Sequence, residues 1–311
     1  MSLVTTYKKN VILRTDVLEV QMILKKKDYF ATRYSLIPDL QLDFASIQGI
    51  TKEKKFMNWL LSFEKEKKKE VFYRAKNYTL YCKQVSINCF FMSFAKELQE
   101  TIGQKTDDGI QDTLINNYKK CNIIIQTDNQ WMLIEKNLNI SNGIESQKNL
   151  IANVISKALE GQSLYFELGI MTEKNNFWKY VMTNKNCLTD IDITLSSPNF
   201  LSGVTSVSDF LHQMQDSYNN TSVKVHLKNE KGHLIINPDN VFLQDVVRYA
   251  SAGCGTWKMK TTTDKTGCSS SDNPYIIPLP DDISQLKDSD QKYIASAIEH
   301  MKQIDSECKK E

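Results

Sequence analysis

The chain has 311 residues, of which 41% are hydrophobic, and its 39 lysines and arginines nearly balance 37 acids, which gives a formal net charge of +2. This length holds one large domain or two ordinary ones, and the apolar share suffices for sizeable cores. The near-neutral charge excludes the global positive field of proteins that coat nucleic acid, so any such contact requires a local basic patch.

Three features bear on the compartment. The longest strongly apolar run, residues 87–95, is interrupted by Asn88 and Ser93 and is shorter than the roughly 20 residues of a membrane-spanning helix. Residues 1–4 lack the layout of a secretion signal, and the seven cysteines never form a Cys-x-x-Cys pair. We therefore expect a cytosolic protein with reduced thiols, without membrane association, structural zinc or a cofactor.

Residues 1–186 predict a mixed α+β domain. Strands are expected at residues 11–13, 31–37, 71–73, 78–85 and 164–170, with a hairpin over residues 121–135. Helices are expected over residues 51–69 and over a stretch that ends near Gly161. The charged run at residues 64–70 is interpreted as the solvated end of the first helix rather than as a phosphate site.

Residues 187–262 alternate strand and helix patterns in the order β-α-β-β-α-β, which is the ferredoxin-like, or split βαβ, arrangement. Strands are expected at residues 189–195, 222–228, 234–236 and 256–260, with the second and third joined as a hairpin through residues 229–232. One helix is expected over residues 205–218. The other has Asn237 as N-cap, Pro238 in its first turn and Gly253 as a left-handed C-cap.

The last part of the chain, residues 263–311, predicts a linker over residues 268–274, an extended stretch near Pro278 and Pro280, and a final helix over residues 289–304 that docks on its own chain. The predicted fold is therefore α+β. It consists of a mixed domain at residues 1–186, a ferredoxin-like module at 187–262, and a linker with a C-terminal helix at 263–311.

The outward positions of the predicted sheet form a local basic surface on an otherwise balanced chain. Its candidate nucleic-acid-binding residues are Lys224, His226, Lys228, Lys258 and Lys260. Such a face can hold the phosphate backbone. It is not a typical RRM, because the outward central positions carry Asp190, Asp192, His233 and Ile235 instead of aromatic residues that stack bases. The alternative interpretation is a solvated face of mixed charge.

Asp190 and Asp192 lie two residues apart on one strand face, a spacing that suits a shared divalent metal in palm-type nucleotidyl enzymes. Only Glu230 adds an acid near the predicted hairpin. We therefore favour pairing of the two aspartates across the sheet with lysines such as Lys258 and Lys260. The Gly253-Cys254-Gly255 segment follows a helix, which is the wrong context for a dinucleotide loop, and we assign no catalytic residue.

Several segments of the C-terminal half together resemble a loose pattern found in bacterial and prophage abortive-infection proteins of the phage-exclusion RexA type. The residues that carry the resemblance are Asn176, Phe177, Trp178, Val181, Asn186, Ser197, Pro198, Asn199, Gly232, Leu234, Gly253, Gly255 and Trp257. The resemblance implies a cytosolic antiphage factor that binds DNA or a phage protein, often as a homodimer, and it brings no catalytic residues.

Three hypotheses follow. The first is a non-enzymatic defence protein that binds DNA or a phage replication or nucleoprotein component through the basic sheet face. The second is a metal-dependent nucleotidyl or nuclease-like enzyme that uses Asp190 and Asp192. The third is a pure protein-interaction module that assembles through an edge strand or the C-terminal helix.

Overall fold

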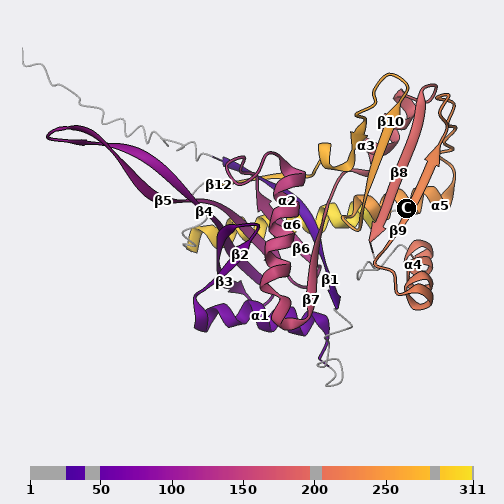
Figure 1. The fold of residues 1–311 in the computed structure, drawn as a ribbon. Helices are drawn as coiled ribbons and strands as arrows, with labels where there is room; N and C mark the ends of the chain where they lie inside the picture. The colour runs from indigo at the N-terminus through magenta and orange to yellow at the C-terminus, as the bar shows by residue number, and fades with distance from the viewer. Residues whose placement is uncertain (1–25, 39–49, 197–204, 281–287, 310–311) are drawn as a thin grey trace, which may run out of the picture.

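A computed structural model describes residues 26–38, 50–196, 205–280 and 288–309, and the strand predicted at residues 11–13 lies outside them. The described chain forms an eight-stranded sheet and a four-stranded sheet, both accompanied by helices (Figure 1). The predicted α+β class is confirmed. Among the described helices, none is both long and apolar enough to cross a bilayer.

The large sheet is antiparallel and curls into a half-barrel. Its strands run in the order β12-β1-β6-β5-β4-β3-β2, and β7 shares one edge of β1 with β12. The strands are β1 (Lys26–Pro38), β2 (Lys68–Tyr73), β3 (Lys76–Ser86), β4 (Cys89–Thr106), β5 (Gly109–Gln126), β6 (Trp131–Glu135), β7 (Leu164–Ile170) and β12 (Ile276–Pro280).

Both faces of the large sheet are covered at its centre. Helices α1 (Lys52–Glu66) and α2 (Ile144–Ala158) pack on one face, where Phe30 and Tyr34 of β1 join their core. Tyr29 and Ala31 point to the opposite face and join a second core with helix α6 (Asp288–Lys309). All five residues of β6 are therefore buried, which explains its continuous apolar run.

The small sheet is antiparallel, with strand order β11-β10-β8-β9. Its strands are β8 (Leu188–Ser196), β9 (Ser222–Lys228), β10 (Gly255–Thr261) and β11 (Cys268–Ser269). Helices α3 (Lys174–Thr183), α4 (Thr205–Tyr218) and α5 (Val241–Ser251) contribute to the core beneath one face of this sheet. Ile191 and Ile193 of β8 point into that core, while Asp190 and Asp192 point to the open face.

The ferredoxin-like order is not confirmed, because residues 234–236 form no strand. Instead β9 pairs directly with β8, and β10 takes the other edge of β8. With both edges of β8 occupied, the chain after β9 turns away. It is tied to β8 by hydrogen bonds from Asn229 N–H to the Thr189 carbonyl (2.7 Å) and from Leu234 N–H to the Leu188 carbonyl (3.3 Å). The side chains of Leu234 and Ile236 pack against the core, while Ile235 is 90% exposed.

The predicted N-cap of the following helix is also wrong. Helix α5 begins after Asn240, whose side chain accepts from Leu243 N–H at 2.9 Å. The side chain of Asn237 accepts from Asp239 N–H at 2.9 Å, so Asn237 and Pro238 form a local turn that precedes the helix. Gly253 has a φ of +83° directly after the C-cap residue, which confirms its predicted left-handed conformation.

Part of the predicted linker forms strand β11, and the stretch predicted to be extended near Pro278 and Pro280 forms β12. Strand β11 pairs with β10 of the small sheet, and β12 pairs with the first half of β1 in the large sheet. The predicted final helix is present as α6, in which Ile294, Ala297 and Met301 are buried and Tyr293 is 37% exposed. The C-terminal part of the chain is therefore integral to the fold.

A buried arginine links strand β1 of the large sheet to the C-terminal end of α5 and to α6. Arg33 of β1 is 2% exposed, and it donates from Nε to the carbonyl of Ala252 and from Nη1 to the carbonyl of Asn129, both at 2.8 Å. Its remaining nitrogen forms an ion pair with Asp305 of α6. The backbone is equally close there, since a Cβ on Gly169 would lie 2.0 Å from the carbonyl oxygen of Gly253.

We expect Asp305→Ala to lower the free energy of unfolding by about 3–5 kcal/mol, because it leaves the Arg33 charge buried without a partner. Denaturant unfolding measures the effect. The control is Lys302→Ala in the same helix, which removes an exposed pair with Glu299 and should cost less than about 0.5 kcal/mol. Equal effects of the two substitutions would contradict a structural role for the buried pair.

Candidate functional site

The five predicted nucleic-acid-binding residues lie on one open face of the small sheet, together with the two predicted metal ligands. In the register, Asp190 lies between Lys228 and Lys260, and Asp192 lies between His226 and Lys258. Lys224 is the next outward residue of β9. We call this surface the lysine face and define it as Lys224, His226, Lys228, Lys258 and Lys260 around Asp190 and Asp192. An acidic strand thus has a basic strand on each side.

The two aspartates are paired, as the sequence suggested, but mainly with β9. Lys224 Nζ lies 3.1 Å from Asp192 Oδ1, and His226 Nε2 lies 3.3 Å from Asp190 Oδ1 and 3.8 Å from Asp192 Oδ1. Lys228 pairs with Glu230 at 2.8 Å. The expected partners Lys258 and Lys260 lie opposite the aspartates in register and are exposed.

The electrostatics of Asp190 reflect these neighbours. Partial burial opposes ionisation, but hydrogen bonds from Thr189 and His226 and the charges of Lys228 and Lys260 outweigh it, so the pKa of Asp190 lies below its ordinary value. The carboxylate is therefore ionised at neutral pH and satisfied by protein groups. It neutralises part of the lysine face from its centre.

The geometry offers little to a metal ion. Within the described ranges, no group of three or more histidine, cysteine, aspartate or glutamate side chains is arranged to hold one. The groups beside Asp190 and Asp192 are the imidazole of His226 and the ammonium group of Lys224, which cannot ligate a metal while charged, and hard divalent cations require several oxygen ligands. Cys254 is fully buried at the end of α5, which leaves no room for a substrate at the Gly253-Cys254-Gly255 segment.

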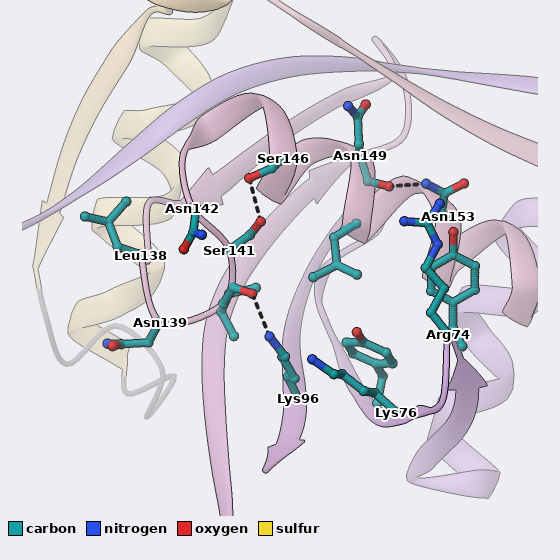
Figure 2. Close-up of a pocket in the computed structure, with 14 residues that line it drawn as sticks. Arg74, Lys76, Lys96, Leu138, Asn139, Ser141, Asn142, Ser146, Asn149 and Asn153 are labelled. Carbon is teal, nitrogen blue, oxygen red and sulfur yellow. Dashed lines mark hydrogen bonds between the residues drawn. The ribbon is translucent and has the colours of Figure 1, made fainter.

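A pocket separate from the lysine face lies in the large-sheet half, where the β2–β3 turn faces the start of α2 (Figure 2). This basic pocket has a volume of about 710 Å³. Three cationic side chains, Arg74, Lys76 and Lys96, line it together with Tyr73, Tyr78, Leu138, Asn139, Ile140, Ser141, Asn142, Ser146, Asn149, Leu150 and Asn153. None of these residues is acidic.

Sequence reasoning missed the basic pocket because its residues come from four separate segments and form no linear motif. Arg74 and Lys76 belong to a hairpin turn, Lys96 to β4, and the asparagines to the loop before α2 and to α2 itself. Residues 137–153 are rich in asparagine and serine, which was the one indication of a polar site, but this composition is also typical of an ordinary loop.

Comparisons with known proteins add no assignment. No protein-family model matches the chain, and a search of curated proteins finds no match. The resemblance to phage-exclusion proteins stays a prediction.

We expect His226→Ala to raise the pKa of Asp190, because it removes a hydrogen bond that favours the ionised carboxyl. Side-chain carbon NMR over a pH series measures the pKa. Since the folded-state pKa is depressed, this carboxylate stabilises the fold above its unfolded pKa of about 3.9, and the contribution is lost as the pH falls through the lower folded value. The control is His300→Ala, which changes an exposed histidine of α6 and should leave the pKa of Asp190 unchanged. If the pKa of Asp190 is also unchanged in His226→Ala, the pairing of His226 with Asp190 is refuted.

Proposed function

We propose that the protein is a non-enzymatic binding protein of antiphage defence that contacts DNA, or a phage nucleoprotein component, through the lysine face. One observation carries the proposal: β9 and β10 present four lysines and one histidine on an open sheet surface, with Asp190 and Asp192 of β8 opposite them in register. A local patch of this kind is what a chain of net charge +2 requires for backbone contact.

The ion pairs on this face do not oppose phosphate binding strongly. Side chains of Lys224 and Lys228 are 57% and 49% exposed, and exposed pairs of this kind contribute little free energy. A phosphate oxygen can therefore replace the carboxylate as partner at small cost. Lys258 and Lys260 are exposed on the other side of the acidic strand and extend the contact across the sheet.

The defence role rests on the resemblance, and two of the segments that carry it lie close together in the structure. Phe177 of α3 lies edge-to-face against Trp257 of β10, with ring centroids 5.6 Å apart, and against Trp178, with centroids 5.0 Å apart. Two sequence segments that carry the resemblance, around residues 177 and 257, thus meet in one core beneath the lysine face.

We expect Lys258→Glu with Lys260→Glu to weaken binding of duplex DNA at low salt by at least tenfold, because two phosphate contacts become repulsions. Fluorescence anisotropy with a labelled duplex measures the affinity. For the unchanged protein, log K should fall with log salt concentration at a slope of about −0.9 for each phosphate contacted.

The matched control is Lys54→Glu with Lys65→Glu, which makes the same change in net charge on exposed positions of α1. This control should retain most of the affinity. Loss of binding in both variants to the same extent would show that only net charge matters, and salt-independent or absent DNA binding would refute the proposal.

A second candidate function, assembly with another copy, is favoured by the projecting part of β4 and β5. We call residues 97–118 the arm; it leaves the body of the large sheet as a two-stranded ribbon (Figure 1). The side chains of Ile110, Leu114 and Tyr118 on one face of this ribbon are 79%, 61% and 53% exposed. Two-stranded ribbons are only marginally stable alone in water, so this apolar surface suits a partner arm.

We expect light scattering after size exclusion to give twice the chain mass of 35.8 kDa for the unchanged protein and the monomer mass for Ile110→Lys with Leu114→Lys. Each lysine places a charge on the apolar surface that the second copy would bury. The control is Ile87→Lys with Ile235→Lys, which alters two equally exposed isoleucines outside the arm. A monomer in the unchanged protein would refute assembly through the arm.

A further inference from the structure

The basic pocket between the β2–β3 turn and α2 combines cations that lack acidic partners. Among the described residues, Arg74 and Lys76 form no ion pair, and Arg74 lies over the Tyr73 ring with 5.2 Å between its guanidinium carbon and the ring centroid. Lys96 Nζ donates to the Ile140 carbonyl at 3.2 Å (Figure 2). Arg74 and Lys96 thus contact neutral groups, and none of the pocket's lining residues offers the three cations an opposite charge.

The ammonium group of Lys76 extends towards Lys96, whose own ammonium group is directed to the Ile140 carbonyl (Figure 2). Partial burial and the charge of Lys76 lower the pKa of Lys96. Two cations in this position repel each other in the empty protein. A bound anion would replace this repulsion by attraction, because it places a negative charge beside both cationic side chains.

The backbone of the pocket wall is strained. Arg74 and Ala75 have φ values of +47° and +57°, so the β2–β3 hairpin makes its tight turn with two residues that are not glycine. Asn and Gly are the residues that usually relieve such a turn, and their absence costs free energy. The turn nevertheless keeps an arginine at this position, beside the pocket.

Helix α2 begins at the opposite wall. Its N-cap, Gly143, makes no side-chain capping bond, and Ser146 and Asn149 of its first turns line the pocket. The acid of the first turn, Glu145, is not among the lining residues and is bound by Lys148 and Ser271. The partial positive charge of the helix start therefore adds to the field of the three cations.

We propose that this pocket binds a phosphorylated small molecule of nucleotide size. Arg74, Lys76 and Lys96 would hold the phosphate groups, and the asparagine side chains with Tyr73 would contact the organic part. The volume of about 710 Å³ lies in the range of small-molecule sites, and a mixture of aromatic, amide and cationic groups is typical of nucleotide recognition. The site is separate from the lysine face and does not depend on the proposed function.

The test uses isothermal titration of the full chain with ADP, adenosine and pyrophosphate at low salt without added metal. We expect ADP and pyrophosphate to bind with one-to-one stoichiometry and adenosine to bind at least tenfold more weakly than ADP. Lys76→Gln with Lys96→Gln should weaken ADP binding at least tenfold, since each charged hydrogen bond removed costs about that factor. Failure of ADP and pyrophosphate to bind at millimolar concentration would overturn the proposal.

Two controls separate this site from other sources of affinity. Lys83→Gln with Lys179→Gln changes two exposed lysines outside the pocket, and Lys258→Glu with Lys260→Glu changes the lysine face; both should leave ADP affinity within twofold. Loss of ADP affinity in either control would overturn the assignment to this pocket. The source of the phosphate is tested by competition. If a 5′-phosphorylated oligonucleotide displaces ADP and the unphosphorylated oligonucleotide does not, the pocket binds the terminal phosphate of a nucleic-acid strand with the same cationic residues.

Stability gives an independent readout. Because Lys96 is a partly buried cation beside Lys76, Lys96→Gln should leave the melting temperature unchanged or raise it while it weakens ADP binding. A purely structural Lys96 predicts the opposite, namely a lower melting temperature with no effect on a ligand. That result would overturn the proposal.

Discussion

The buried charge of Arg33 is the constraint on which the arrangement of the two sheets depends. It sits in the central part of β1 and reaches the end of α5 through Ala252, the β5–β6 turn through Asn129, and α6 through Asp305. A buried guanidinium must have all these partners, because its desolvation is otherwise too costly. The close approach of Gly169 and Gly253 brings the backbones near enough for these contacts. The C-terminal helix is thereby fixed to a strand 272 residues earlier in the chain.

This connection determines which surfaces stay open. Helix α6 and β12 belong to the core between the two sheets, together with Ile191 and Ile193 of β8. The alternate residues of β8 consequently face away from that core, and with them the lysines of β9 and β10. The basic pocket lies in the large-sheet half, at the N-terminal end of α2, whereas β7 follows the C-terminal end of that helix. The two charged sites are thus built on separate parts of one framework.

Sequence patterns predicted the local elements better than their pairing. Alternation located β8, β9 and β10 and therefore every residue of the lysine face, because strand periodicity alone decides which side chains share a face. Residues 234–236 alternate equally well, yet the occupied edges of β8 leave them without a partner. The long β4–β5 ribbon was missed because most of the arm is polar, and the basic pocket because its cations meet only through sheet pairing.

We propose the lysine face, rather than the arm or the pocket, as the surface that contacts nucleic acid. Chemical-shift mapping of amide groups during titration with a short DNA duplex tests this directly. The account predicts the largest changes at Lys224, His226 and Lys228 of β9 and at Lys258 and Lys260 of β10, fading as salt is added. Changes confined to residues 97–118 or to the pocket around Lys76 and Lys96, with β9 and β10 unaffected, would contradict it.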